Sequence, residues 1–342
     1  MLLSRRLAPL ALSRTMPISL SRPVLLAAAV GRRCLTAASA PPPPPPHAFA
    51  HQQQPASAAP SNTSTVDASE ISKFVRMSAE WWSLDGKFAP LHAQNPTRVG
   101  FIREHAIAHF FSPGAAATHA QASATSAAFN LALPLRGLRI AEIGCGGGLL
   151  SEPLARLGAE VTGVDAAPEN IGMALAHRAL DPVLLQPRAL TYMAVTAEDL
   201  LERHGGEAQF DVVCAMEIVE HVSDPTTFVR SLARLLRPGG ILFMSTLNRT
   251  HKAYAMAIVG AEYVLRWLPP GTHDWHKFVT PAELTAQVNG AGLLVREMNG
   301  IVLDPLTWRW GLSLSDIDVN YIMCAVKPLG EAAADGGATK QL

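Results

Sequence analysis

Short apolar runs alternate with amphipathic helical stretches along most of the chain after residue 137. The runs that this pattern predicts to be strands are Leu138–Ile143, Glu160–Val164, Leu190–Val195, Phe210–Ala215, Ile241–Thr246, Leu293–Met298 and Tyr321–Val326. Between them, helical periodicity covers Leu149–Leu157, Pro168–Ala179 and Pro225–Leu236. We therefore predict a doubly wound, mostly parallel, Rossmann-like α/β sheet of seven strands with helices on both faces. The last two strands are expected to form an antiparallel edge.

Two helices are predicted before the sheet, within residues 70–111. Phe74, Met77 and Trp81 recur near helical spacing, which indicates an amphipathic helix. A second helical stretch follows the Asn-Pro pair at 95–96 and runs from about 97 to 110. Residues 112–130 are rich in Ala, Ser and Thr and are expected to form a loose connector, and 331–342 a disordered tail.

The first 66 residues differ in composition from the rest of the chain. They contain six Arg, no Lys and no acidic residue, and the first carboxylate is Asp67. An Arg- and Ser-rich segment without acids is typical of an organellar transit peptide. The six prolines of Pro41–Pro46 and the polar stretch after them favour an extended, disordered linker. We therefore assign 1–66 to a mitochondrial transit peptide and linker, and 67–330 to the folded domain.

The formal net charge of zero is the sum of two unlike parts. The chain has 28 basic and 28 acidic residues, but without the first 66 residues it has 22 basic and 28 acidic ones, a net charge of −6. A nucleic-acid-binding protein is expected to show a positive excess instead, so we expect no nucleic-acid partner. The four cysteines are scattered without a C-x-x-C pair, which indicates neither a disulfide framework nor a zinc ribbon.

A glycine-rich segment follows the first predicted strand directly. Gly144, Gly146 and Gly148 lie where the chain turns into a helix, and Asp165 follows 21 residues after Gly144, at the end of the next strand. Glycine lets a ligand approach the backbone closely, and a carboxylate at that position can accept hydrogen bonds from ribose hydroxyls. Both a dinucleotide and S-adenosylmethionine (SAM) suit this arrangement.

Two neighbouring residues distinguish these cofactors. The dinucleotide fingerprint requires a small residue at its sixth position, where this chain has Leu149. Glu142, just before the loop, suits the cationic amino group of SAM. The sequence therefore favours SAM and disfavours a nicotinamide oxidoreductase.

Two carboxylates and an imidazole follow the fourth predicted strand. Glu217, Glu220 and His221 lie at the carboxyl end of a parallel strand, where open sheets bind ligands. If they continue as a helical turn, the two Glu side chains share one face and His221 lies beside Glu217. Such a set could bind a divalent ion. The alternative is an acidic helix start with a hydrogen-bonded histidine.

Several motifs together resemble those of the class I SAM-dependent methyltransferases. The matching segments are 142–148, 164–165, 196–199, 210–213 and 236–240. The resemblance implies that Glu198 or its neighbour lies near the adenine and that Met216 lines the same pocket. For Met216, ordinary core packing is the alternative.

Further segments resemble the O-methyltransferases of ubiquinone biosynthesis in particular. These are the paired Trp through Asn-Pro-x-Arg region at 81–102, Met-Glu-x-x-Glu-His at 216–221, Ser-Thr-x-Asn-Arg at 245–249, and the segments 271–275 and 318–321. The resemblance covers about Glu70 to Lys327. It departs in 112–130, at Ser83 and in 179–190, none of which touches the cofactor motifs.

This resemblance implies a site and a reaction. SAM would be bound by Arg98, Gly144, Asp165 and Met216, and a divalent cation, Mg²⁺ first of all, by the Glu217, Glu220 and His221 set. A guanidinium such as that of Arg98 can clamp the carboxylate of SAM, although on its own a solvated helix charge would be the simpler interpretation.

The substrate implied is a polyprenylated catechol or quinol, methylated on a ring hydroxyl. The cation would lower the pKa of that hydroxyl. His273 is the best candidate for a general base, with a structural turn histidine as the alternative. The enzyme would work at the matrix face of the mitochondrial inner membrane, as a peripheral protein in a complex with other ubiquinone-biosynthesis proteins.

An apolar stretch at Ala253–Leu268 bears on membrane contact. Glu262 and Arg266 interrupt it, and it is too short to cross a bilayer. We expect an insert helix within about 250–275, either buried or lying in the membrane interface.

Two other functions remain open at this point. Some metal-dependent RNA 2′-O-methyltransferases also carry Glu-x-x-Glu-His, but the net charge of −6 opposes an RNA substrate. A non-catalytic scaffold subunit would be expected to have a damaged cofactor loop, and here the loop is intact.

Overall fold

The computed structural model describes residues 64–112 and 130–329. The predicted transit peptide, most of the Ala-rich connector and the C-terminal tail lie outside these ranges. Residues 64–66, which we had placed in the linker, take part in the fold. The Thr65 side chain is buried, and Val66 forms an isolated antiparallel bridge with Val222. The described fold therefore includes residues before 67.

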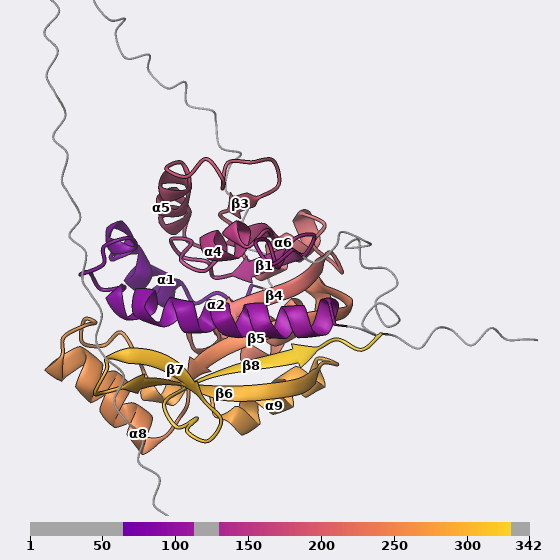
Figure 1. Cartoon of the computed structure of the whole chain (residues 1–342). Coiled ribbons are helices and arrows are strands. Elements are labelled where there is room, and N and C mark those ends of the chain that lie inside the picture. Colours follow the sequence, from indigo (N-terminus) through magenta and orange to yellow (C-terminus); the bar gives the residue numbers. More distant parts are fainter. Residues whose placement is uncertain (1–63, 113–129, 330–342) are drawn as a thin grey trace, which may run out of the picture. The chain divides into compact units, whose positions relative to one another are not determined.

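Within the described residues, eight strands form one mixed sheet (Figure 1). Their bounds are β1 Arg139–Ile143, β2 Glu160–Val164, β3 Leu190–Met193, β4 Phe210–Met216, β5 Leu236–Leu247, β6 Leu294–Asp304, β7 Arg309–Ser313 and β8 Asn320–Val326. The predicted α/β class is confirmed, and the seven predicted strands are all present. The eighth, β7, was missed because it is short, contains a glycine and has no buried face.

The strand order is β3-β2-β1-β4-β5-β8-β6-β7. The first five strands in this order run parallel, and β8, β6 and β7 add antiparallel pairs, which confirms the predicted edge. Register is set by pairs such as Ile140 with Val161 on β2 and with Val212 on β4. Because the strand order reverses between β1 and β4, a crevice is expected outside the carboxyl ends of these strands.

Helices cover both faces of the sheet. The α-helices are α1 Ala68–Val75, α2 Ala89–Phe110, α4 Ser151–Arg156, α5 Pro168–Arg178, α6 Ala197–Arg203, α7 Pro225–Leu235, α8 His251–Ala253 and α9 Pro281–Gly290. Short 3-10 turns are η1 Ser78–Glu80, η2 Val219–His221 and η4 Trp275–Lys277, and η3 Tyr254–Val264 is a π-helix. One core lies under α2, α4 and α5, and a second lies under α6, α7 and α9.

The helix α7 shows how the sequence produces this packing. Asp224 caps its first turn by accepting from the backbone N–H of Thr227 (3.0 Å), and Pro225 occupies the first helical position. Phe228 and Leu232 are four residues apart and both lie in the second core. A polar cap and an apolar stripe are therefore enough to place this helix on the sheet.

The second N-terminal helix begins earlier than predicted. It starts at Ala89 and contains Pro96, whereas the sequence pattern suggested a start at about Thr97. Contacts outside the helix hold the turns before the proline. The His92 Nε2 atom lies 2.8 Å from the Trp81 carbonyl oxygen, and the Asn95 amide donates to the Leu149 carbonyl (2.6 Å). Tertiary contacts thus override the usual helix-breaking effect of proline.

The insert is a shorter helix than predicted. Its helical part runs through α8 and the π-helix η3 to Val264, and helical structure resumes only at Trp275. In the ranges that the structure describes, no helix is long and apolar enough to cross a membrane. π-Helical turns are frequent at functional sites.

Gly300→Ala is expected to destabilise the protein. Gly300 lies on β6, where an added Cβ would collide with the backbone carbonyl of Asp316. We expect a loss of about 1–3 kcal/mol in the free energy of unfolding, measured by urea denaturation. The matched control is Gly172→Ala on α5, where nothing lies within 4 Å of the added Cβ. It should stabilise the helix by up to about 1 kcal/mol. Equal midpoints for Gly300→Ala and the unsubstituted protein would contradict this account.

Candidate active site

The glycine loop connects β1 to α4 in a conformation that requires glycine. Gly144, Gly146 and Gly148 have positive φ angles of 73°, 53° and 88°, which side chains with a Cβ rarely adopt. The backbone N–H groups of Gly144 and Cys145 both donate to the carbonyl of Val164, at 2.8 and 2.9 Å. These bonds fasten the loop to the end of β2.

The paired tryptophans pack against this loop. A Cβ at Gly146 would collide with the Trp81 ring. The Trp82 indole N–H donates to the Gly147 carbonyl (2.9 Å), and that of Trp81 donates to Asn170 on α5 (2.8 Å). The Trp pair therefore holds the loop in place.

Asp165 follows β2 and reaches back to the loop. Its carboxylate accepts from the backbone N–H groups of Gly146 (2.9 Å) and Ala167 (2.8 Å), and from the side chain of Asn170 (3.1 Å). Burial raises the pKa of Asp165, although these hydrogen bonds oppose the shift. The carboxylate is thus held at the predicted position beside the glycine loop.

Glu142 lies on β1 with its side chain buried. It accepts a short hydrogen bond from the Ser151 hydroxyl. Burial raises the pKa of Glu142 to about 8, so the group is mostly protonated at neutral pH. A cation bound next to it would favour the charged form, which is the role that the sequence analysis gave it.

Arg98 and Glu217 both line the cavity and are hydrogen-bonded to each other. The Arg98 Nη2 atom donates to Gln94 (2.8 Å) and to Glu217 (3.2 Å), and Ser245 donates to the same Glu217 oxygen (2.9 Å). The Nε of Arg98 is buried and makes no hydrogen bond to any residue that the structure describes. Arg98 is therefore buried rather than solvated, and has a donor left for a ligand.

Glu220 is buried behind Glu217. It accepts from the Thr246 hydroxyl (2.8 Å). Burial, followed by the charge of Glu217, raises the pKa of Glu220 to about 8. Glu217 itself has a φ of +52°, which is strained for a non-glycine residue and is a feature found at functional sites.

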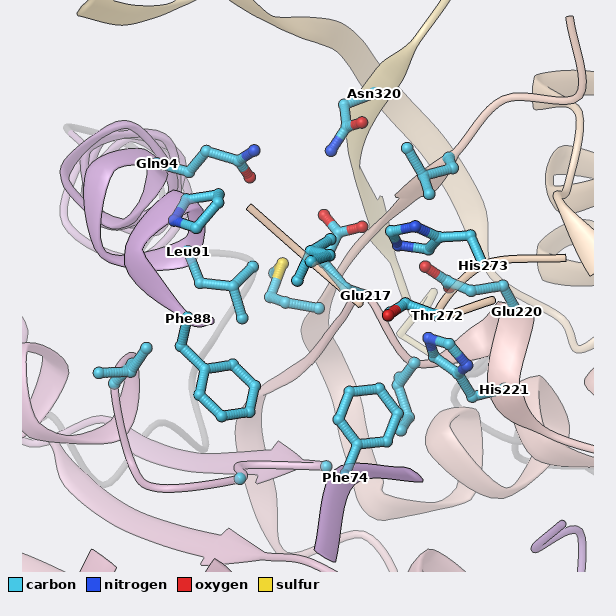
Figure 2. Close-up of a pocket in the computed structure, with 18 of the residues that line it drawn as sticks. Phe74, Phe88, Leu91, Gln94, Glu217, Glu220, His221, Thr272, His273 and Asn320 are labelled. Atoms are coloured by element: carbon cyan, nitrogen blue, oxygen red, sulfur yellow. The ribbon is translucent and has the colours of Figure 1, made fainter. Parts of the chain in front are cut away.

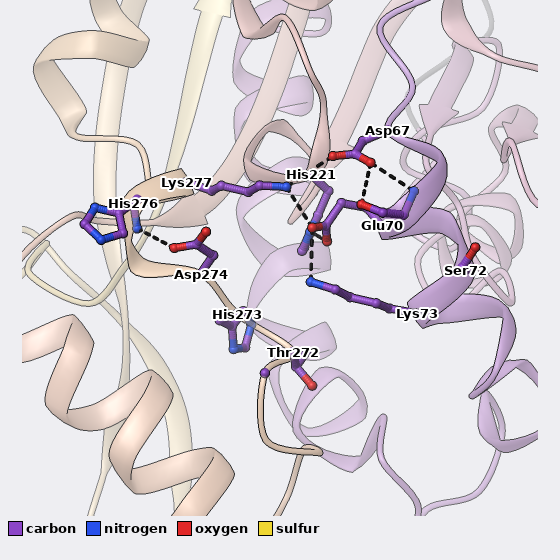
Figure 3. Close-up of polar contacts among 12 residues, drawn as sticks. Asp67, Glu70, Ser72, Lys73, His221, Thr272, His273, Asp274, His276 and Lys277 are labelled. Atoms are coloured by element: carbon purple, nitrogen blue, oxygen red, sulfur yellow. Dashed lines mark hydrogen bonds and ion pairs between the residues drawn. The ribbon is translucent and has the colours of Figure 1, made fainter.

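His221 bonds to the N-terminal helix instead of to its neighbours. Its Nδ1 atom lies 2.9 Å from Glu70 on α1, and Glu70 also accepts from Lys277 (2.8 Å) and Lys73 (3.1 Å) (Figure 3). The hydrogen bond from His221, together with these ammonium groups, holds the pKa of Glu70 far below its usual range despite burial. This network joins α1, η2 and η4.

The predicted metal cluster is not present in this arrangement. Within 64–112 and 130–329, no three His, Cys, Asp or Glu side chains are placed so that they could hold a metal ion. We had expected a regular helical turn to bring Glu217, Glu220 and His221 together. The strained backbone at Glu217 and the 3-10 turn after it instead direct the three side chains to different partners.

Glu198 and Met216 both line the cavity. One Glu198 oxygen accepts from Thr65 (3.0 Å), and the other is buried without a hydrogen-bond partner among the described residues. Met216 ends β4, belongs to the core under α2 and also lines the cavity. The two interpretations of Met216, core packing and pocket lining, therefore both hold.

One cavity of about 530 Å³ is lined by the predicted site residues. Figure 2 shows part of its wall, with Glu217, Glu220, His221 and His273 labelled. The size of the cavity is within the range of about 300–1,000 Å³ that is usual for small-molecule sites. The predicted site residues that line it are Arg98, Glu142, Gly144, Gly146, Asp165, Glu198, Met216, Glu217, Glu220, His221 and His273. Residues more than 170 positions apart in the sequence thus contribute to a single site.

Sequence reasoning missed the apolar part of the cavity wall. It is formed by Met256, Leu265 and Trp267 of the insert region and by Trp308 and Trp310 near β7. The apolar composition of 253–268 was a usable signal. Nothing in the sequence pattern showed that the missed strand β7 would bring two further tryptophans to it.

A glycine loop at the end of β1, with Asp165 at the end of β2, suits a nucleotide-containing cofactor, and the family match identifies the class as a methyltransferase. Residues 115–297 match the family model described as "Methyltransferase domain". The ubiquinone biosynthesis O-methyltransferase of Cereibacter sphaeroides is 47% identical over 268 residues, which is 78% of this chain and 99% of that protein. The protein of the same name from Caulobacter vibrioides is 48% identical over 274 residues, 80% of this chain and 99% of that one. The chain belongs to the ubiquinone biosynthesis O-methyltransferase family.

Among solved structures, magnesium protoporphyrin IX methyltransferase from Synechocystis PCC 6803 with bound SAM matches with a TM-score of 0.47. It is 18% identical, and the match covers 77% of this chain and 98% of that one. The family assignment rests on the sequence relatives.

Glu142→Gln is expected to remove a proton release that accompanies SAM binding. At about pH 7 the carboxyl, with its pKa raised to about 8, carries a proton, and the ammonium group of SAM would expel it. Calorimetry at about pH 7 in buffers of different ionisation enthalpy measures this release. Glu169→Gln, which changes an exposed carboxylate on α5, is the control. Equal proton release in the Glu142→Gln variant and the unsubstituted protein would contradict the assignment.

Proposed function

We propose that this enzyme transfers a methyl group from SAM to a ring hydroxyl of polyprenylated catechol and demethylubiquinol intermediates. The observation that supports this most strongly is the single cavity. It connects the glycine loop and Asp165 with a polar region around Glu217 and with an apolar region formed by the insert and β7. These three parts suit, in order, the cofactor, the hydroxylated ring and an isoprenoid tail.

The reaction requires an oxygen nucleophile in line with the sulfonium methyl group. The ring hydroxyl loses its proton, the oxygen forms a bond to the methyl carbon, and the bonding pair of the broken S–CH₃ bond returns to sulfur. The cavity walls hold both reactants in register, which lowers the entropic part of the barrier. We assign the acceptance of the proton to His273, the cavity-lining histidine of the loop after the insert.

The apolar region is suited to the tail. The indole rings of Trp267 and Trp308 lie edge to face at 6.1 Å, and Met256 and Leu265 line the same wall. Burying apolar surface there would contribute about 25 cal/mol per Å².

Assistance by a divalent cation is a separate proposal. Its support is the donor chemistry of Glu217, Glu220 and His221, which line one side of the cavity. In the described conformation each of them is bonded elsewhere, so no step above passes through a metal ion.

We propose location at the matrix face of the mitochondrial inner membrane, with other ubiquinone-biosynthesis proteins as partners. The support is the composition of residues 1–66 and the lipid character of the substrate. Exposed apolar side chains of the insert suit peripheral contact with the bilayer; Tyr263 is 57% and Val264 70% exposed. The relatives' names and the intact loop do not favour an RNA substrate or a scaffold role.

The full-length protein is expected to methylate a short-tailed catechol when given labelled SAM. The label should appear on a ring oxygen, identified by mass spectrometry of the product. Absence of transfer, with and without added Mg²⁺, would contradict the function. If a cation assists, EDTA should abolish transfer and Mg²⁺ restore it. Transfer that EDTA leaves unchanged would remove the metal proposal and keep the function.

Replacing Tyr263 and Val264 by Asp is expected to weaken binding to cardiolipin-containing liposomes. Neither side chain lines the cavity, so the double variant should keep its SAM affinity. The measurement is flotation of the full-length protein with liposomes. Leu180→Asp is the matched control, because Leu180 is 77% exposed but lies after α5, away from the insert. Equal loss in both variants, or no loss in either, would contradict membrane contact through the insert.

A further inference from the structure

Glu262, in the π-helix of the insert, is a buried carboxylate. Its side chain is inaccessible to solvent, although the flanking residue Tyr263 is exposed. Both carboxylate oxygens accept hydrogen bonds from the loop after the insert. Oε2 accepts from the backbone N–H of Gly271 (2.7 Å), and Oε1 from that of His273 (2.9 Å). The His273 Nδ1 atom also lies 3.0 Å from Oε1.

These hydrogen bonds keep Glu262 ionised in a buried place. Burial by itself would raise the pKa of Glu262, but the side chain and backbone of His273, with Gly271, lower it overall. A charged carboxylate accepts only, so the His273 Nδ1 atom must carry the proton that it donates. The neutral imidazole is then fixed in the tautomer whose Nε2 has a free lone pair.

His273 presents its ring to the cavity. Its ring points toward the middle of the cavity, on the side of the Glu217 carboxylate (Figure 2). The ring is also held edge to face by Phe278, with centroids 5.9 Å apart. In the part of the chain that the structure describes, no hydrogen bond to its Nε2 is found. The ring is therefore fixed on one side and open on the other.

His221, the second histidine that lines the cavity, is held differently. Its carboxylate partner, Glu70, also accepts hydrogen bonds from Lys277 and Lys73 (Figure 3). Glu262 has no such competing cations: among the described residues, its ionic partner is His273 alone. The charge of Glu262 therefore acts on one imidazole.

From this geometry we infer that Glu262 is the positioning residue of a carboxylate–histidine pair, in which His273 Nε2 takes the proton from the substrate hydroxyl. The inference rests on the proposed function and adds to it the residue that orients the base. The O–H bond breaks, its proton moves to Nε2, and its electrons remain on oxygen, which attacks the methyl carbon. The sulfonium becomes a neutral thioether, and the imidazolium later returns its proton to solvent. Glu262 stabilises the imidazolium without accepting the proton.

The test compares Glu262→Gln with Glu297→Gln in the full-length protein. Glu297 bonds the Nε2 of His105 at 3.0 Å, so it forms a carboxylate–histidine pair of similar length, but it does not line the cavity. Each variant is assayed with a short-tailed catechol and with its nitro derivative, whose hydroxyl is far more acidic and needs less help from a base. The affinity for SAM is measured in parallel.

With the catechol, Glu262→Gln should lower kcat by about tenfold or more, within the roughly 10²–10⁴-fold that a general base contributes. Its KM and SAM affinity should be unchanged, and its loss with the nitrocatechol should be much smaller. His273→Gln should show the same selectivity, and Glu297→Gln should show no loss. An equal loss on both substrates, or none, would overturn the inference.

A further measurement does not depend on the folding of a variant. The ¹⁵N NMR spectrum of the unsubstituted protein should show the neutral His273 ring protonated at Nδ1. Protonation at Nε2 would overturn the inference. If the unsubstituted protein methylates neither catechol, the proposed function fails and the inference fails with it. If the unsubstituted protein methylates both substrates but the loss in Glu262→Gln is equal on both, the proposed function is kept and the inference is rejected.

Discussion

Burial of carboxylates is the constraint on which this active site depends. Glu70, Glu142, Glu220 and Glu262 are each at most 4% exposed, and removing a charge from water is costly unless partners compensate it. The structure meets this cost in two ways. Glu70 and Glu262 have lowered pKa values because protein donors surround them, whereas Glu142 and Glu220 have raised ones, near 8. The first pair stays charged inside the fold, whereas the second pair is mostly protonated at neutral pH.

This division corresponds to two kinds of task. Glu70 connects α1 to η2 and η4, and Glu262 connects the π-helix of the insert to the loop after it. Each of them also fixes a histidine that lines the cavity. Glu142 lies beside the glycine loop, where the cationic amino group of SAM is expected. Perturbed carboxylates around one cavity are typical of enzymes, and here the direction of the shift separates groups that orient from groups that can respond to a ligand.

Much of the fold was predictable from the sequence because its signals are local. The apolar runs, the glycine loop and Asp165 lie on neighbouring strands, and parallel strands bring their carboxyl ends to one edge whatever the connections between them. The start of α2 was not predictable, because contacts of His92 and Asn95 with distant backbone groups override the effect of Pro96. Strand β7 was missed for a related reason: it pairs with β6 without a buried face to mark it.

The site residues follow the same rule, with one difference in local geometry. All predicted residues reached the cavity, but their partners were invisible in the sequence. Arg98 meets Glu217 across 119 positions, and His221 meets Glu70 across 151. The metal prediction assumed a regular helical turn after β4. A positive φ at Glu217 and a 3-10 turn changed the directions of three side chains, which no spacing rule could show.

The insert carries a buried carboxylate and outward-facing side chains within one short helix. Glu262 is buried and bonded to the loop of His273, while Tyr263 and Val264 beside it face outward. Glu262, Tyr263 and Val264 are consecutive residues of one helix, so a displacement of the helix moves all three. Any displacement of the outward face would therefore move the carboxylate that orients His273. If the outward face contacts the membrane and His273 is the base, both would depend on the position of this one helix. Delivery of the lipid substrate and deprotonation of its hydroxyl would then be linked.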